Sequence, residues 1–214
     1  MEGAAPVRRV PRPRADALRN RERLVTAARE MFVEFGCAVP YDEIARRAGV
    51  GNATLYRNFP ERPGLVHEVV LSILARLTER AERAAAEEAD TFAALSRFAH
   101  AAADEGVGAL CPMLDGTFDK DHPDLVVERE RLGEAVEGLV RRARDAGRLR
   151  ADIGVGDLMV GVSQLTRPLP GTGCDDFAPF VHRHLQIFLD GLEAPARSAL
   201  PGATATLEDL RRDA

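Results

Sequence analysis

The sequence predicts an all-α protein of about nine helices, in which a small N-terminal three-helix unit precedes a larger helical bundle. Apolar residues recur at spacings of three and four along most of the 214 residues, and no segment alternates as a half-buried strand does. Gly and Pro separate the periodic segments. A tight turn, Ala48-Gly49-Val50, lies between two short helical segments and predicts a helix-turn-helix.

Three segments build the N-terminal unit. The first helix is predicted over residues 16–35, with one apolar stripe of Leu18, Leu24, Val25, Ala28, Met31, Phe32 and Phe35. The second carries Tyr41, Ile44, Ala45 and Ala48 on one face. Gly49 then occupies a position that suits a helix-ending residue with positive φ.

The next short helix has few positions that face a core. Leu55 and Phe59 point inward at i and i+4, and the residues around them are small or polar. Such a face suits a helix that enters the DNA major groove. The alternative is an ordinary hairpin of a helical bundle, against which the tight turn and the polar outer face both argue.

These residues resemble a known family. The stretch EIARRAGVGNATLYRNFPER is similar to the DNA-binding domain of the TetR family of bacterial transcriptional regulators, and the resemblance covers about residues 16–70. It implies a double-stranded DNA operator as partner. The residues that it places at the DNA are Asn52, Thr54, Tyr56, Arg57, Asn58 and Arg62.

Four residues depart from the family pattern. Pro40 replaces a frequent Thr or Ser, so it offers neither a hydroxyl nor an N–H to a phosphate. Gly51 replaces a frequent Ser cap with little loss. Asn58 replaces the usual His, and Arg62 replaces the usual Lys while keeping its charge.

Charge is divided unevenly along the chain. Residues 1–63 hold 12 arginines and 8 acidic residues, a net charge of +4, whereas the remainder holds 17 basic and 26 acidic residues, a net charge of −9. The positive field therefore lies at the end predicted to meet DNA. Residues 1–15 are predicted to form a disordered arm that either lies along DNA or merely aids solubility; its basic residues are Arg8, Arg9, Arg12 and Arg14.

The rest of the chain continues the helical period. A long helix follows Pro63, and the further helices are predicted over 91–103, 124–146, 157–166 and 176–192. Gly and Pro break residues 106–122 into short turns. We therefore expect a helix-turn-helix domain over 16–62, a regulatory domain over 63–193 and a flexible tail over 194–214.

The resemblance implies a homodimer formed through the last two helices and a pocket for a small-molecule effector between the helices of the regulatory domain. The candidate lining residues are Leu77, Phe92, Leu95, Phe98, Leu110, Met113, Phe118 and Met159, with Gln164, His100 or His122 as polar contacts. For each of them, a position in the plain core or at the surface is the more common explanation.

Other classes of protein are disfavoured. No GxSxG, P-loop or HExxH motif occurs, so we expect no enzyme. The three cysteines, Cys37, Cys111 and Cys174, form no metal-ligand spacing, which predicts reduced thiols in the cytoplasm, with no cofactor and no metal. No run of 18 apolar residues predicts a membrane span.

The sequence thus predicts a ligand-responsive regulator, a homodimeric repressor that binds a palindromic operator and is released by a small apolar or amphipathic effector. Two alternatives stay open. One is an activator of the same fold, and the other is a helical ligand-binding or interaction protein whose DNA-binding domain has degenerated.

Overall fold

The chain is all-α, as the sequence predicts. A computed structural model describes residues 13–36, 38–109, 119, 121–167, 174–206 and 208–209. Within these ranges the chain forms eight α-helices and one short 3₁₀ helix, and its β structure is limited to an isolated antiparallel bridge between Leu149 and Glu193. None of the described helices is long and apolar enough to cross a membrane.

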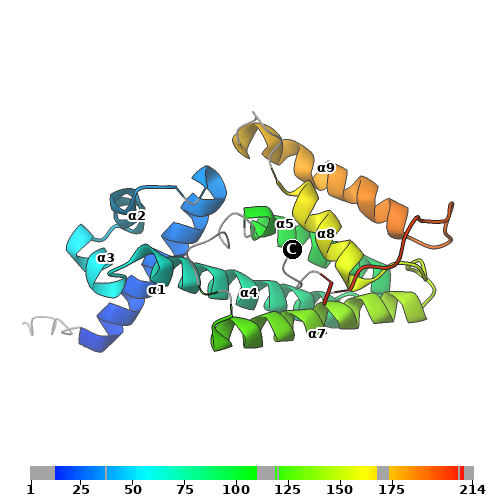
Figure 1. Cartoon of the computed structure of the whole chain (residues 1–214), viewed down its shortest axis with the longest axis horizontal. Helices are drawn as coiled ribbons and strands as arrows, with labels where there is room; N and C mark the ends of the chain where they lie inside the picture. Colours follow the sequence, from blue (N-terminus) through cyan, green and yellow to red (C-terminus); the bar gives the residue numbers. More distant parts are fainter. Residues whose placement is uncertain are drawn as a thin grey trace, which may run out of the picture.

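Three helices form the N-terminal unit: α1 (Pro13–Phe35), α2 (Tyr41–Ala48) and α3 (Asn52–Asn58) (Figure 1). Their apolar faces meet in a small core in which Leu24, Phe32, Ile44 and Leu55 are fully buried. The helix α1 begins at Pro13 rather than at residue 16, because proline is well tolerated in a first helical turn. Arg14, expected in a disordered arm, is therefore helical, and Arg8, Arg9 and Arg12 lie outside the described residues.

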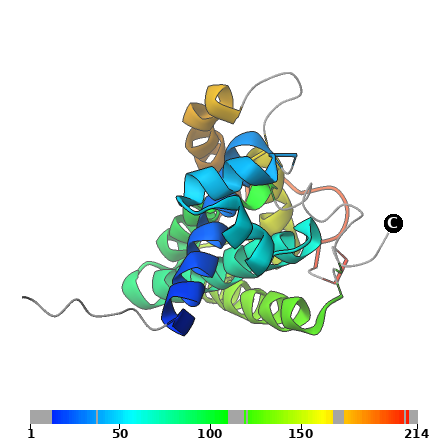
Figure 2. The ribbon, with the colours of Figure 1, turned by 90° about the vertical axis from the view of Figure 1, so that its left-hand side faces the viewer.

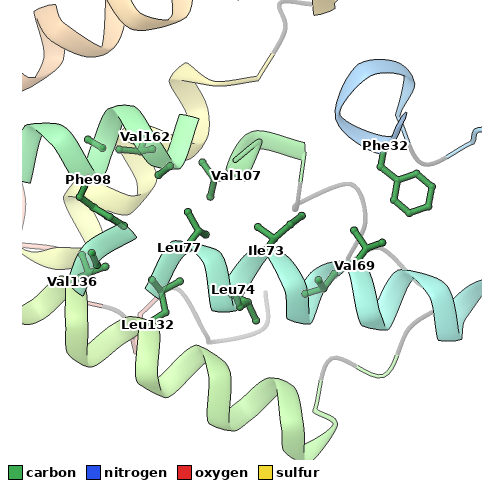
Figure 3. Packing of buried hydrophobic residues seen from close by; sticks show 14 of the residues in the cluster. Phe32, Val69, Ile73, Leu74, Leu77, Phe98, Val107, Leu132, Val136 and Val162 are labelled. Atoms are coloured by element: carbon green, nitrogen blue, oxygen red, sulfur yellow. The ribbon is translucent and has the colours of Figure 1, made fainter. Parts of the chain in front are cut away.

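The helix α4 (Arg62–Glu87) is the longest described element and connects the N-terminal unit to the bundle (Figure 1). It begins with Pro63 in its first turn and packs against α1, α5 and α7. Ile73 and Leu77 point toward Val107, while Leu74 points toward α7 (Figure 3). All three leucine and isoleucine side chains are buried, so α4 carries the core of the bundle on more than one face.

The bundle is completed by α5 (Thr91–Asp104), the 3₁₀ helix η1 (Val107–Ala109), α7 (Pro123–Asp145), α8 (Val155–Leu165) and α9 (Cys174–Leu192). The helices predicted in these regions are confirmed, with bounds that differ by one or two residues. The carboxylate of Asp90 accepts the N–H groups of Phe92 and Ala93, both at 2.9 Å, and so fixes the start of α5. Of the predicted short turns over 106–122, η1 is described, and residues 110–118 and 120 lie outside the described residues.

The described part of the tail, which we expected to be flexible, makes specific contacts with the bundle. The carbonyl of Ala205 accepts the N–H of Gly156 at 3.1 Å, and its own N–H donates to Asp157 Oδ1 at 3.2 Å. A Cβ at Gly156 would lie 2.5 Å from the Ala205 carbonyl, so glycine is required for this approach. Arg150 also donates to the carbonyl of Ser198 at 2.7 Å. Sequence composition does not report such long-range backbone contacts.

Candidate nucleic-acid interface

The turn between α2 and α3 has the conformation that the sequence predicts. Gly49 has φ of 62°, its N–H donates to the carbonyl of Arg46 at 3.1 Å, and the N–H of Val50 donates to that of Ala45 at 3.0 Å. This pair of hydrogen bonds is a Schellman motif, which ends α2 sharply and satisfies its last carbonyls. The turn therefore fixes the direction in which α3 leaves α2.

Two apolar side chains anchor α3, and the rest of the helix faces outward. Leu55 is fully buried and Phe59 is 2% exposed. Asn52, Tyr56 and Arg57 are exposed, whereas Thr54 and Asn58 are half-buried. Figure 2 shows the N-terminal unit in front of the bundle, at one end of the molecule. A seven-residue helix held by two residues thus presents a polar face at that end.

Two of the predicted contact residues also have structural partners. Asn58 Nδ2 donates to the carbonyl of Thr54 at 2.7 Å, so its amide helps to end α3. The guanidinium carbon of Arg62 lies 5.5 Å from the ring centroid of Phe32 and 5.8 Å from that of Tyr41. Arg62 is half-buried over these rings and so stabilises the packing of the unit through cation–π contacts.

Tyr41 and Tyr56 form the link between α2 and the exposed face of α3. Their ring centroids are 5.5 Å apart, and the Tyr41 hydroxyl donates to the carbonyl of Phe59 at 3.4 Å. Burial raises the pKa of Tyr41, and the nearby charge of Arg62 opposes this rise. Tyr41 therefore stays protonated and keeps its hydrogen bond across the physiological pH range.

Arg21 has a positioning role that sequence reasoning missed. Its Nη2 lies 2.6 Å from Glu68 Oε1 on α4, its Nη1 donates to the carbonyl of Asn58 at 3.3 Å, and its guanidinium lies 4.4 Å from the centroid of the Phe59 ring. One side chain of α1 thus holds the end of α3 and the start of α4. No local signal could reveal this role, because the partners are far apart in sequence.

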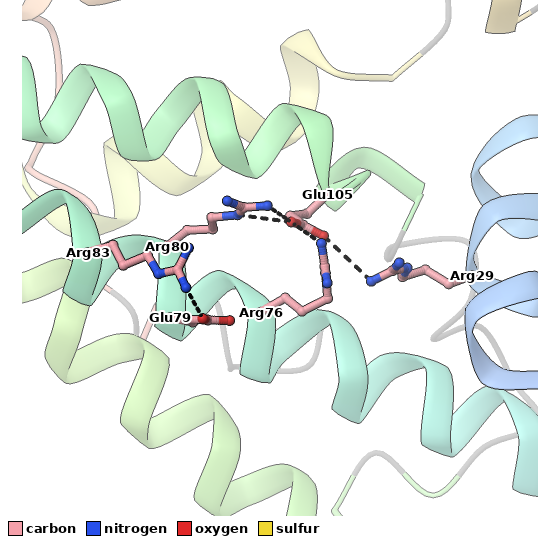
Figure 4. Close-up of polar contacts among 6 residues, drawn as sticks. All are labelled: Arg29, Arg76, Glu79, Arg80, Arg83 and Glu105. Atoms are coloured by element: carbon pink, nitrogen blue, oxygen red, sulfur yellow. Dashed lines mark hydrogen bonds and ion pairs between the residues drawn. The ribbon is translucent and has the colours of Figure 1, made fainter. Parts of the chain in front are cut away.

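The N-terminal unit is joined to the bundle through a buried carboxylate at the end of α5 (Figure 4). Glu105 is 6% exposed. It accepts hydrogen bonds from Arg76 at 2.5 and 2.8 Å and from Arg80 at 3.0 and 3.1 Å, and Arg29 of α1 lies 3.7 Å away. We call these four residues the Glu105 cluster.

Burial and the neighbouring charges shift the pKa values of three members of the Glu105 cluster. Burial opposes the ionisation of Glu105, but the hydrogen bonds from Arg76 and Arg80 outweigh it and hold the pKa of Glu105 below its ordinary value. The hydrogen bond to Glu105 raises the pKa of Arg76. Burial, and then the charge of Arg76, lower the pKa of Arg29. Glu105 is therefore the anion that allows three arginines of two helices to lie together.

The residue after Glu105 lets α1 approach closely. Gly106 has φ of +76°, and a Cβ at this position would lie 2.3 Å from Cγ2 of Val33 on α1. Glycine is thus required both by the backbone conformation and by the contact. The N-terminal unit meets the bundle through Arg29 and Val33, one turn apart on the same helix.

None of the described residues predicted for the effector pocket lines the three pockets given below, and their role as effector contacts stays a prediction. Leu77, Phe92, Leu95 and Phe98 are buried in the core, Met159 packs partly buried against it, and Gln164 is exposed. His100 bonds to Gln186 at 3.1 Å, and His122 caps α7. Leu110, Met113 and Phe118 lie outside the described residues.

Three pockets among the described residues are lined by other side chains. A groove of about 710 Å³ lies between α1, α4 and α7, and another of about 670 Å³ lies between α1 and α2. A third, of about 420 Å³, is lined by α7, the start of α8 and the tail. Helical period placed Leu77, Phe92, Leu95 and Phe98 correctly at buried positions, whereas Leu18 and Phe35 of the predicted α1 stripe are 62% and 61% exposed.

Together, the Schellman turn, the anchored polar helix and the all-α bundle define a helix-turn-helix DNA-binding regulator of transcription. The model of bacterial regulatory proteins of the tetR family matches residues 24–69, and that of the SbtR-like transcriptional regulator C-terminal domain matches residues 90–194. The chain belongs to the TetR family of bacterial transcriptional regulators.

Solved structures agree with this assignment. TetR transcriptional regulator SCO0520 from Streptomyces coelicolor is 29% identical, with a TM-score of 0.60, over 82% of this chain and 99% of that chain. The TetR regulatory protein from Mycobacterium vanbaalenii is also 29% identical, with a TM-score of 0.54, over 85% and 99%. PfmR from Thermus thermophilus, at 21% identity over 80% and 100% of the two chains and a TM-score of 0.52, shares the fold. No curated protein sequence matches this chain.

Proposed function

We propose that the protein is a homodimeric repressor in the cytoplasm, which binds a palindromic operator and is released by a small apolar or amphipathic effector. The polar face of α3 is the observation that carries the proposal. Leu55 and Phe59 fix the helix from below, so Asn52, Tyr56 and Arg57 are free of core packing and face solvent. We assign base edges to Asn52 and Thr54.

Phosphate contacts are assigned to Arg57 and to the hydroxyl of Tyr56. Arg57 is exposed in the last turn of α3, and Tyr56 is 49% exposed with its ring supported by Tyr41. Asn58 and Arg62 have a weaker claim as DNA contacts, because the amide of Asn58 is bonded to α3 and Arg62 lies over two rings. We retain both in the proposed interface, at its edge.

The homodimer is proposed to form through α8 and α9. Val160 on α8 and Phe180 and Ile187 on α9 are 41%, 52% and 59% exposed, which leaves large apolar side chains of both helices in water in the single chain. The two helices are themselves closely packed, since a Cβ at Gly161 would lie 2.2 Å from the Phe188 ring. A pair of recognition helices about 34–36 Å apart would then match one turn of DNA.

Release by an effector requires that the bundle and the N-terminal unit move together. The Glu105 cluster supports this part of the proposal, because one carboxylate bonds α4 and pairs with α1. An effector that binds one arrangement of the bundle better would shift the spacing of the recognition helices. The free energy by which the effector shifts the equilibrium between the two arrangements can be no larger than the difference in its binding free energy for them.

Selection of bound sequences from random DNA, with the full-length protein, tests the proposal. We expect an inverted repeat, and a complex with two chains by sedimentation. I187E should yield monomers with weakened operator binding, whereas V127E, a matched exposed valine on α7, should remain dimeric. If no sequence is enriched, the degenerate-domain alternative replaces our proposal. Transcription that rises when the protein is added to the operator template would identify an activator instead.

A further inference from the structure

Two histidines and an aspartate gather where α4 passes the start of α7. His67 lies on α4 and His122 precedes α7, and their ring centroids are 4.5 Å apart in an edge-to-face arrangement. Asp124 Oδ2 lies 3.8 Å from His122 Nδ1. One ligand atom from each of the three residues lies within 4.8 Å of the other two. The fold alone brings them together, since His67 is remote from the others in sequence.

These are ligands of divalent transition metals. Imidazole nitrogen and carboxylate oxygen bind Zn²⁺ and its neighbours at about 2.0–2.2 Å, so ligand atoms on one tetrahedral ion are about 3.3–3.6 Å apart. The present spacing requires only small rotations of the three side chains. Such rotations are feasible because both histidines are half-buried and Asp124 is exposed. Three protein ligands would leave one tetrahedral position for water.

The charges around the cluster favour a cation. The positive end of the α7 dipole opposes one. However, Asp124 lies in the first turn of α7, and Asp119 and Asp121 precede it, with the N–H of Asp121 bonded to Asp119 Oδ1 at 3.1 Å. Lys120 offsets part of this negative charge in the sequence. The net charge of residues 119–124 is still negative.

Capping of α7 does not account for the cluster. His122 Nδ1 accepts the N–H of Asp124 at 3.3 Å, a long hydrogen bond that a metal ion could replace at little cost. Asn, Asp and Ser are stronger caps than histidine, and a cap has no need of a second imidazole beside it. The capping role of His122 therefore does not explain why His67 lies beside it.

We propose that His67, His122 and Asp124 bind one divalent transition-metal ion, represented by Zn²⁺. The ion would join the first half of α4, which follows the recognition helix, to the start of α7. This inference is independent of the proposed repressor function, because metal binding is measured without DNA.

The test uses the full-length protein, freed of metal by a chelator and kept reduced by a phosphine that does not bind Zn²⁺. Calorimetry with Zn²⁺ should show one ion per chain, and Zn²⁺ should raise the Tm. Co²⁺ should give the visible absorption of a low-symmetry nitrogen and oxygen site. H67Q, H122N and D124N should each weaken binding at least tenfold. H122N retains a good helix cap, so it separates loss of the metal ligand from loss of the cap.

The chain offers a matched control in a second histidine pair. His100 Nδ1 and His182 Nδ1 are 2.9 Å apart, and His182 Nε2 lies 3.0 Å from Asp104. H182Q should leave the affinity for Zn²⁺ unchanged. The proposal is overturned if no saturable binding occurs, if H182Q abolishes binding while H122N retains it, or if Co²⁺ gives an intense near-ultraviolet thiolate band, which would identify cysteine ligands. Should H67Q fail to fold, H122N and D124N decide the question.

Discussion

Arg76 and Glu105 form a two-pronged ion pair between α4 and the end of α5, with Nε at 2.5 Å from Oε2 and Nη2 at 2.8 Å from Oε1. The same carboxylate bonds Arg80 and lies 3.7 Å from Arg29 of α1. Since α1 belongs to the N-terminal unit and α5 to the bundle, this carboxylate is a mechanical connection between the two.

Loss of that anion should destabilise the protein. E105Q keeps the shape of the side chain but removes the negative charge that the three arginines share, and we expect the free energy of unfolding to fall by about 2–3 kcal/mol. This value is at or below the lower end of the about 3–5 kcal/mol that is usual for breaking a buried ion pair, because Arg76 and Arg80 are partly exposed. Urea unfolding measures the change. E79Q is the control, since Glu79 and Arg83 form an exposed pair, and it should cost less than about 1 kcal/mol. Equal effects of the two substitutions would contradict the role of Glu105.

The contribution of Glu105 should depend on pH in a defined direction. Its pKa in the folded protein lies below the ordinary value of 4.5, because the hydrogen bonds from Arg76 and Arg80 outweigh burial. Its stabilisation is therefore complete above the ordinary pKa and is lost as pH falls through the folded pKa. The difference in unfolding free energy between wild type and E105Q should narrow as pH is lowered from about 7 to about 3. A difference that stays constant over this range would show that the pKa of Glu105 is the same in the folded and the unfolded protein, and so that the arginines do not stabilise its anion.

Gly106 should be far less tolerant of alanine than another glycine with similar φ. G106A combines a strained backbone with a Cβ 2.3 Å from Val33 Cγ2, whereas G36A has φ of +79° and open space around its Cβ. We expect G36A to cost about 1 kcal/mol through strain alone, and G106A about 1–3 kcal/mol more through overpacking. Thermal unfolding compares them. V33A in the G106A background should recover part of the difference, and no recovery would place the cost elsewhere.

Arg57 should contribute to DNA affinity without contributing to sequence preference. R57A should weaken binding to operator and to unrelated DNA alike, and lower the slope of log K against log salt by about one. Fluorescence anisotropy at several salt concentrations measures both quantities. R83A, which removes an arginine from the distant half of α4, should change neither. If the double variant Y56F/R57A binds the operator as wild type does, our assignment of this face is wrong.

Asn52, in contrast to Arg57, should contribute to sequence preference and not to the salt dependence of binding. It is exposed at the start of α3, and loss of a contact to a base edge costs about 1–3 kcal/mol at one position of the operator. N52A should therefore relax the preference at that position while the salt dependence stays unchanged. Competition between operator variants with single base changes provides the measurement. A uniform loss across all variants would make Asn52 a phosphate contact.

Sequence reasoning reached those features that depend on neighbouring residues. Gly49 ends α2 with positive φ, and Leu55 and Phe59 anchor α3, because turn chemistry and helical period are local properties. The Glu105 cluster and the bridging role of Arg21 could not be predicted from the sequence. The position of a charged residue in a helical pattern does not indicate which distant residue it will contact. The effector pocket was predicted from apolar residues, and apolar character alone does not distinguish a packed core from a cavity.

The contact between the tail and α8 has a practical meaning for the whole molecule. The N–H of Gly156, in the first turn of α8, is satisfied by a carbonyl near the end of the chain. The tail is thus hydrogen-bonded to the first turn of α8, a helix that we assign to the dimer interface. Proteolysis or truncation that removes Ala205 would break both of its hydrogen bonds to α8, so the assembly of this regulator should be sensitive to the loss of that residue.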